Sequence, residues 1–186
     1  MSWTTISAAD VAPQRWKNDG GWTRELLAWP HPADWVLRFS VADIERDGPF
    51  SAFPGVQRWI AVLEGGGISL AGQPLTAGDA PWPFDGALAP HCRLRGGATR
   101  DFNAMHRRGQ GRADLRSALP ALQPEGAAFV ALFGVAGGEL LHGGRAMGLP
   151  ALGLAWCEQP AEQALQFTGR GPAWCLRWWP SRAEAG

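Results

Sequence analysis

The sequence predicts an all-β protein, and three observations lead to this prediction. The 186-residue chain holds 25 glycines and 15 prolines, which favours many short strands joined by turns. Large rings come from 11 tryptophans and 8 phenylalanines, enough to fill a barrel or sandwich interior. Almost no segment keeps the apolar spacing of an amphipathic helix for three turns. We therefore expect short strands wrapped around an aromatic interior.

The clearest strand patterns lie in the first half of the chain. Residues 35–42 alternate, with apolar side chains on one face and Arg38 and Ser40 on the other. This pattern is typical of an antiparallel strand with one wet or pocket-facing side. Residues 58–64 are predicted as the next strand, and the glycines after them form a bend into a strand at residues 68–71.

One segment, residues 113–119, has the character of a helix. It is short, and Pro120 would end it because proline cannot continue the helical hydrogen-bond pattern. The segment lies near the middle of the chain, where it would connect two halves. We predict an N-terminal barrel with the polar pocket at residues 1–110 and a C-terminal barrel at residues 111–186, which together form one compact unit.

The two halves share a pattern of strand, glycine bend and strand. Residues 61–73 align with residues 131–144 when one inserted residue is allowed. A repeat of this kind predicts a duplicated barrel or sandwich. The copies differ near their ends, because residues 99–108 carry alternating polar groups whereas residues 173–179 are largely aromatic and apolar. A pocket is therefore expected in the first half.

The charge balance and the cysteines limit the classes of function that the sequence supports. Lys plus Arg and Asp plus Glu both number 17, so no strong field exists to attract nucleic acid or an anionic membrane. No apolar run approaches the length of a membrane span, and no secretory signal is visible. Cys92, Cys157 and Cys175 are too widely spaced for a disulfide framework, and we expect buried thiols in a cytoplasmic protein. Edge strands of β-barrels often pair between chains, so the sequence also allows a homodimer.

Four segments together resemble the HutD/Ves family of bacterial proteins. They are residues 16–25 (WKNDGGWTRE), residues 40–55 with DGPFS and then FPG, residues 83–86 (PFDG) and residues 100–105 (RDFNAM). The matched pattern runs from about Trp16 to Arg108, and the second half matches only loosely. The resemblance implies a bicupin fold, in which one chain forms two cupin-type barrels of the RmlC-like jelly-roll kind.

The resemblance also implies a link to bacterial histidine utilisation. A protein of this kind would sense a small acid of histidine breakdown, namely N-formylglutamate, formate or urocanate, and would moderate expression or flux. The Ves branch is associated instead with stress and cold induction. One position departs from the family pattern, because Asp19 stands where glycine is common. We expect this carboxylate either to pair with Lys17 or to repel an anionic ligand.

Metal and nucleophile chemistry find little support in the sequence. The four histidines, His31, His91, His106 and His142, are too far apart for the ligand spacing of a cupin metal site, so we expect no metal and no other cofactor. No cysteine or serine has the context of a nucleophile. Acid–base catalysis stays open, because Asp101 or Glu45 could serve as a general base.

The remaining polar groups predict a pocket for a small anion. Lys17 is the only lysine beside 16 arginines, and its compact charge with three donors suits a small carboxylate or formyl oxygen. Arginines would hold carboxylates, amides and a hydroxyl would hold formyl or amide groups, Asp101 would accept from a ligand NH, and apolar side chains would form a wall. The predicted ligand contacts are Lys17, Asn18, Arg38, Ser40, Phe50, Arg58, Phe84, Asp101, Asn103 and Met105.

We therefore predict a non-catalytic protein that binds a small anionic metabolite and modulates histidine utilisation. One alternative is a metal-independent enzyme, an isomerase or a deformylating hydrolase, with Asp101 as its base. Another is a stress-induced protein with a structural or protein-interaction role. For the residues themselves, the structural alternative to ligand contacts is that Arg38, Arg58 and Asp101 form a core ion-pair network that fixes the strand register.

Overall fold

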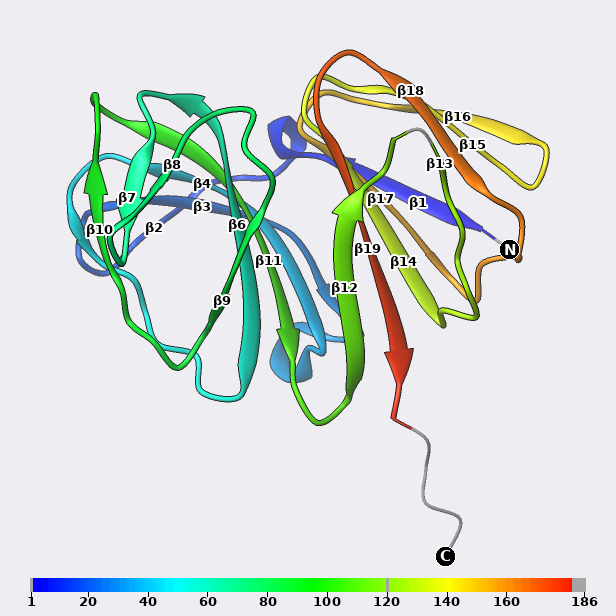
Figure 1. Cartoon of the computed structure of the whole chain (residues 1–186), viewed down its shortest axis with the longest axis horizontal. Helices are drawn as coiled ribbons and strands as arrows, with labels where there is room; N and C mark the ends of the chain where they lie inside the picture. Colours follow the sequence, from blue (N-terminus) through cyan, green and yellow to red (C-terminus); the bar gives the residue numbers. More distant parts are fainter. Residues whose placement is uncertain (1, 120, 182–186) are drawn as a thin grey trace, which may run out of the picture. The chain divides into compact units, whose positions relative to one another are not determined.

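The computed structural model describes residues 2–119 and 121–181 (Figure 1). Regular structure in this part of the chain is β-strand, apart from two short 3-10 helices, η1 (Ala8–Asp10) and η2 (Pro32–Asp34). This confirms the predicted all-β class. The chain divides into two compact units. The first unit is Val11–Arg108, and the second unit combines the described residues up to Asp10 with those from Gly109 onward.

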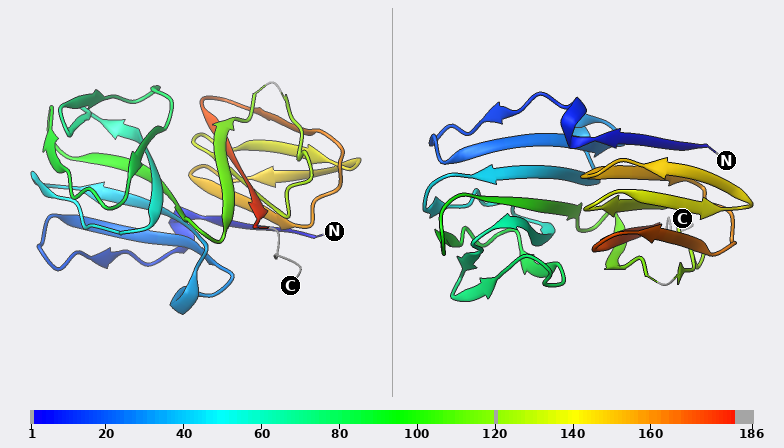
Figure 2. Two further views of the ribbon diagram at one scale, coloured as in Figure 1. Left: turned by 60° about the horizontal axis from the view of Figure 1, so that its bottom comes forward. Right: turned by 90° about the horizontal axis from the view of Figure 1, so that it is seen from above.

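The first unit contains two antiparallel sheets. The larger sheet has the strand order β2 (Gln14–Arg15), β3 (Gly21–Trp29), β4 (Leu37–Ile44), β11 (Thr99–Arg107), β6 (Val56–Gly65) and β9 (Trp82–Asp85). The smaller sheet has the order β5 (Gly48–Pro49), β10 (His91–Leu94), β7 (Ile68–Leu70) and β8 (Gln73–Leu75). Strands β3, β4 and β11 run side by side in both views of Figure 2. The strands predicted at residues 35–42, 58–64 and 68–71 correspond to β4, β6 and β7.

The second unit also contains two antiparallel sheets. The larger sheet has the order β1 (Trp3–Ser7), β17 (Gly153–Glu158), β14 (Phe129–Gly134), β19 (Ala173–Pro180) and β12 (Gly111–Ser117). The smaller sheet has the order β13 (Ala121–Leu122), β18 (Leu165–Gly169), β15 (Gly138–His142) and β16 (Arg145–Leu149).

The two units have the same topology. The order β9-β6-β11-β4 in the first unit matches β17-β14-β19-β12 in the second, and β5-β10-β7-β8 matches β13-β18-β15-β16. This agreement confirms the duplication predicted from the glycine bends. The units differ at their sheet edges, where β3 and β2 extend the first large sheet and β1 extends the second.

Two features differ from the sequence prediction. Residues 113–119 do not form a helix, because β12 pairs with β19 from Gly111 to Ser117 and this sheet pairing outweighs a short helical preference; Pro120 lies outside the described residues. The amino-terminal segment lies in the second unit rather than in a barrel of residues 1–110, since β1 pairs with β17 along its whole length. That pairing joins segments about 150 residues apart, which local patterns do not reveal.

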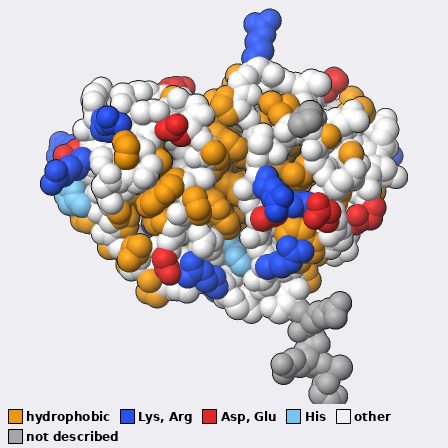
Figure 3. Space-filling model, in the orientation of Figure 1, with side chains coloured by type: hydrophobic (Ala, Val, Ile, Leu, Met, Phe, Trp, Pro, Cys, Tyr) orange, Lys and Arg blue, Asp and Glu red, His pale blue; other side chains and the backbone are white. Residues whose placement is uncertain are grey.

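Each unit has its own apolar core. The core of the first includes Ile60, Val62 and Leu70, and that of the second includes Leu132 and Leu140. The three cysteines are free and buried, as predicted, and burial raises the pKa of Cys92 to about 12, so its thiol is unreactive at neutral pH. No helix in the described part of the chain has the length and hydropathy to span a membrane. Basic and acidic side chains are interspersed on the face shown in Figure 3.

Candidate functional site

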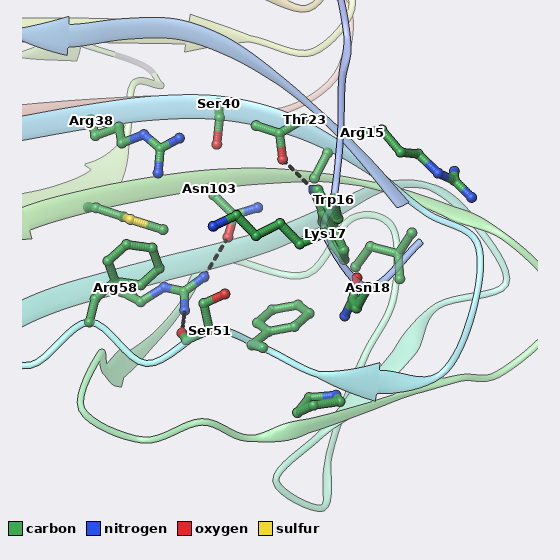
Figure 4. A pocket seen from close by; sticks show the side chains of 16 residues that line it. Arg15, Trp16, Lys17, Asn18, Thr23, Arg38, Ser40, Ser51, Arg58 and Asn103 are labelled. Carbon is green, nitrogen blue, oxygen red and sulfur yellow. Dashed lines mark hydrogen bonds between the residues drawn. The ribbon is translucent and has the colours of Figure 1, made fainter. Parts of the chain in front are cut away.

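The first unit holds a cavity of about 580 Å³ (Figure 4). Strands β3, β4, β6 and β11 form one wall, and the lining is completed by Arg15 at the end of β2, residues 16–18 after it, Pro49 at the end of β5 and residues 50–53 after it. The strand register explains which side chains meet. Ser40 lies opposite Asn103, and Met105 lies between Arg38 and Arg58 on the two neighbouring strands. Because side chains alternate along a strand, these residues share the inner face.

Most of the side chains predicted as ligand contacts line this cavity. They are Lys17, Asn18, Arg38, Ser40, Phe50, Arg58, Asn103 and Met105. The lining also includes residues that sequence reasoning did not select, which are Arg15, Trp16, Thr23, Ala42, Ile44, Pro49, Ser51 and Phe53. Ala42 and Ile44 could have been selected, because they continue the alternation of Arg38 and Ser40. Ser51 and Phe53 lie on an irregular loop, where no periodicity indicates direction.

Two predicted residues lie outside the lining. Phe84 lies behind Arg58, with its ring centroid 4.7 Å from the guanidinium carbon. Asp101 is fully buried further along β11, opposite Ala42 and Val62. Burial raises the pKa of Asp101 to about 7, and an interaction with the Thr99 side chain offsets part of this rise. Alternation along the strand placed Asp101 correctly on the same face as Asn103, but it could not show how deeply the Asp101 side chain is buried.

Arg58 is the main electrostatic feature of the cavity. Its side chain is only 5% exposed, and among the described residues no carboxylate forms an ion pair with it. Nη1 donates to the Ser51 carbonyl at 3.1 Å and Nη2 to Asn103 Oδ1 at 3.4 Å. Burial, with the nearby charge of Arg38, lowers the pKa of Arg58 to about 10, so it stays cationic at neutral pH.

Aromatic rings surround this guanidinium. The rings of Phe50, Phe53 and Phe84 have centroids 5.4, 5.3 and 4.7 Å from the guanidinium carbon of Arg58. Cation–π attraction compensates part of the cost of burying the charge, but it supplies no counterion. A buried cation that lacks an acidic partner favours the binding of an anion.

The other cations of the cavity are not equivalent to Arg58. Arg38 Nε donates to Glu25 at 2.6 Å, and Arg15 Nη1 donates to Glu45 at 2.6 Å, so both charges are compensated within the protein. Lys17 forms no ion pair among the described residues, and its side chain reaches into the cavity toward Asn103 (Figure 4). The lining thus carries two uncompensated positive charges, one buried at Arg58 and one near the solvent at Lys17.

The turn after Lys17 shows which basic side chain the Asp19 carboxylate contacts. Its carboxylate accepts from Arg15 Nε at 3.3 Å and not from Lys17. Asp19 has a φ of 55°, a left-handed conformation in which glycine carries no steric cost. Glycine at this position would relieve the backbone and would give up only the contact with Arg15. Asn18 stabilises the same turn, because its Oδ1 accepts from the Gly20 amide at 3.1 Å.

The described residues include no group of three or more His, Cys, Asp or Glu side chains arranged to hold a metal ion. The polar atoms that line the cavity are mainly donors, from guanidinium, ammonium, amide and hydroxyl groups. No acidic side chain belongs to the lining. The arrangement can bind a small anion by charge and hydrogen bonds, with Phe50 and Met105 as its apolar wall.

The second unit contains a buried charged side chain that the sequence analysis did not predict. Residues 173–179 were described as largely aromatic, yet Arg177 in this strand is only 2% exposed and is held by ion pairs with Asp114 and Glu125. Arg177 lies opposite Asp114 on β12 and Val130 on β14. The alignment of residues 61–73 with residues 131–144 sets Ile60 of β6 against Val130 of β14, so Asn103, which lies opposite Ile60 and Ser40, corresponds to Arg177.

The family model HutD matches residues 8–175. The chain belongs to the HutD family. An uncharacterized 21.2 kDa protein in the hutC 3'region of Pseudomonas putida is 40% identical over 108 residues, which cover 54% of this chain and 56% of that protein. Protein Ves of Citrobacter koseri is 38% identical over 110 residues, 55% of this chain and 57% of that protein. The chain thus spans about half the length of the curated relatives it matches.

Solved structures are similar over nearly the whole chain. HutD from Pseudomonas fluorescens, from a formate condition, has a TM-score of 0.81 at 26% identity and covers 97% of this chain and 100% of that one. A conserved protein of unknown function from Pseudomonas aeruginosa has a TM-score of 0.78 at 30% identity, with coverages of 95% and 97%. Oxalate decarboxylase OxdC of Bacillus subtilis, at 11% identity, a TM-score of 0.56 and coverages of 97% and 78%, shares the fold alone. These similarities confirm the bicupin fold of the HutD family, which is linked to histidine utilisation.

Proposed function

We propose that this HutD-family chain binds a small carboxylate metabolite of histidine breakdown in the first-unit cavity, and that occupancy modulates histidine utilisation without turnover. The observation that carries the proposal is Arg58, a buried guanidinium with no acidic partner among the described residues. A ligand carboxylate would supply the missing counterion through charge-assisted hydrogen bonds. We further propose a cytoplasmic location, because buried free thiols suit a reducing compartment.

The lining supports a ligand with more than one polar group. A carboxylate at Arg58 would leave Ser40 and Asn103 to hydrogen-bond a formyl or amide group, while Lys17 would attract a second acid near the cavity mouth. Phe50 and Met105 offer apolar contact to the carbon chain between these groups. N-formylglutamate carries all of these groups. Urocanate carries a carboxylate and a ring, and formate carries the carboxylate alone.

The position of Asp101 favours binding over catalysis. A general base must reach the proton that it removes. Asp101 is fully buried and lies outside the cavity lining, and no other acidic side chain belongs to that lining. The two acids raised for the enzymatic alternative thus lie away from the lining, since Asp101 is buried deeper in the sheet and Glu45 pairs with Arg15.

Isothermal titration calorimetry tests the proposal. We expect wild-type protein to bind at least one of N-formylglutamate, urocanate and formate, and Arg58→Met to lose at least about tenfold in affinity, because the buried charge pair disappears. Arg100→Met is the matched control. It removes the same charge from β11, but Arg100 pairs with Asp43 and Glu64 and does not line the cavity.

Two results would contradict the proposal. One is the absence of carboxylate binding at millimolar concentration; the other is equal loss of affinity in both variants, which would indicate a general effect of net charge. Incubation of wild-type protein with N-formylglutamate, followed by an assay for free formate, tests the enzymatic alternative. Release of formate that depends on the protein would replace binding by catalysis.

A further inference from the structure

Each unit buries one arginine guanidinium. In each, a loop at the equivalent place in the topology accepts a hydrogen bond from that guanidinium. In the first unit, the loop from β5 to β6 offers the Ser51 carbonyl to Arg58 Nη1 at 3.1 Å. In the second, the corresponding loop from β13 to β14 offers the Gln123 carbonyl to Arg177 Nη1 at 2.7 Å. The arginines come from different strands, since Arg58 lies on β6 and Arg177 on β19, but the two loops occupy the same place in the topology.

The loops differ in what else they contribute. Residues 50–55 contain no acidic side chain. In the second unit Glu125 follows closely after Gln123, and its Oε1 lies 2.9 Å from Arg177 Nη1. The loop of the second unit thus supplies the carboxylate that the loop of the first unit lacks.

A charge count shows why Glu125 is needed. Asp114 accepts from Arg177 Nε at 3.0 Å and from Nη2 at 2.7 Å, but it also pairs with Arg116 at 2.9 Å. Two guanidiniums therefore share the single charge of Asp114, and one positive charge is left over. The carboxylate of Glu125 neutralises that charge at the buried arginine.

Glu125 makes this contact from an unfavourable backbone conformation. Its φ is 52°, a left-handed conformation that is strained for a residue with a Cβ and free of strain for glycine. Two hydrogen bonds hold the loop in place, because Trp179 Nε1 donates to the Glu125 carbonyl at 2.8 Å and the Gly126 amide donates to Glu162 Oε1 at 2.9 Å. The Glu125 side chain itself remains 62% exposed, so solvent and solutes reach its position.

We propose that the second unit contains an anion site of its own, centred on Arg177 and occupied by the chain's own Glu125 carboxylate. A free monocarboxylate of the size of formate or acetate takes this position when the Glu125 carboxylate is removed. The loop of residues 123–126 acts as a tethered ligand, and tethering gives it the advantage of a high effective concentration over free acids. This second site is independent of the metabolite proposed for the first unit.

The test is chemical rescue of a side-chain deletion, measured by thermal unfolding. Arg58→Met is introduced first, so that the first-unit cavity does not dominate the response. In that background Glu125→Ala is expected to lower Tm by several degrees. Sodium formate or acetate at about 100 mM is expected to restore about 3 °C or more beyond the effect of sodium chloride at equal ionic strength, since a ligand that binds only the folded state raises its stability.

Glu162→Ala in the same Arg58→Met background is the matched control. It removes one acid that contacts the same loop, but Glu162 binds the Gly126 amide and forms no ion pair with Arg177 among the described residues. Its loss of Tm is expected to respond equally to formate and chloride. Glu125→Gly provides a second variant if Glu125→Ala does not fold, because glycine adopts the φ of 52° without steric cost and also leaves the position of the carboxylate vacant.

Equal responses of the Glu125 variants to carboxylate and chloride would overturn the second site, as would an equal carboxylate response in the Glu162 control. These outcomes leave the first-unit proposal unaffected, because that proposal depends on wild-type binding that Arg58→Met abolishes. Conversely, rescue of Glu125→Ala without any carboxylate binding by wild-type protein would support the second site and contradict the first-unit function.

Discussion

The two units bury one arginine each, and they differ in whether an acidic side chain neutralises its charge. Arg58 in the first unit is 5% exposed and has backbone, amide and aromatic neighbours, and burial lowers its pKa to about 10. Arg177 in the second unit is 2% exposed and contacts Asp114 and Glu125, and hydrogen bonds to these carboxylates raise its pKa. The comparison teaches that the same fold can use a buried cation for stability or for ligand recognition, depending on whether the chain supplies the anion.

The largest expected effect is on the paired arginine. Asp114→Ala removes two hydrogen bonds from Arg177 and leaves Glu125 as the one carboxylate beside this buried guanidinium among the described residues. Breaking a buried pair in this way costs about 3–5 kcal/mol of unfolding free energy. Urea denaturation would measure the loss. Asp34→Ala, which breaks an exposed pair with Arg107, is the control and should have only a small effect. A small effect of Asp114→Ala would remove the contrast between the two arginines.

The unpaired arginine is expected to respond with the opposite sign. Arg58→Met replaces a buried, uncompensated charge with an apolar side chain that fits among three phenylalanine rings. We expect the unfolding free energy to be unchanged or higher by about 1–2 kcal/mol, while carboxylate binding is lost. The same urea experiment, run beside calorimetric titration, checks both parts. Strong destabilisation of Arg58→Met would indicate that this arginine is structural.

The buried acid of the first unit predicts a pH dependence of stability. Burial raises the pKa of Asp101 in the folded state to about 7, so between about pH 4 and 7 the folded state binds more protons than the unfolded state. The free energy of unfolding therefore falls as pH rises through this range. Burial of His106, which lowers its pKa to about 4, acts in the opposite direction over the same range.

Asp101→Asn separates these two contributions. The variant keeps the shape of the side chain and cannot ionise, so its stability should fall less than that of wild-type protein between pH 4 and 7. Denaturation at several pH values would measure the difference. Parallel pH profiles for the two proteins would indicate that Asp101 titrates normally and that it is less buried than its position on β11 suggests.

The smallest expected effect concerns the turn beside Lys17. Asp19→Gly relieves the left-handed conformation at φ 55° and gives up only an exposed contact with Arg15, so we expect a gain of at most about 1 kcal/mol. Asp19→Ala is the matched comparison, because it loses the same carboxylate and keeps a Cβ. Thermal unfolding of the two variants should rank glycine above alanine. The reverse order would show that the left-handed conformation of residue 19 does not limit stability.

The sequence by itself determined the all-β class, the duplication and the inner face of the first unit. Alternation along residues 35–42 placed Arg38 and Ser40 on one side of a strand, and the glycine bends marked the repeat, because strand period and turn chemistry are local properties. Arg58, Asn103 and Met105 were predicted as contacts of one ligand from their chemistry, and the strand register is what brings them to one face.

Only the tertiary structure decided how deeply side chains are buried, which distant strands pair and which buried charges are neutralised. Asp101 shares a face with Asn103 yet lies outside the cavity lining, and β1 and β12 pair with strands far along the chain. Whether a buried arginine is free or neutralised depends on acids contributed by distant segments, Asp114 and Glu125 for Arg177 and none among the described residues for Arg58. Such contacts arise from packing between segments, and the free energy of a buried charge depends on the groups that surround it in space.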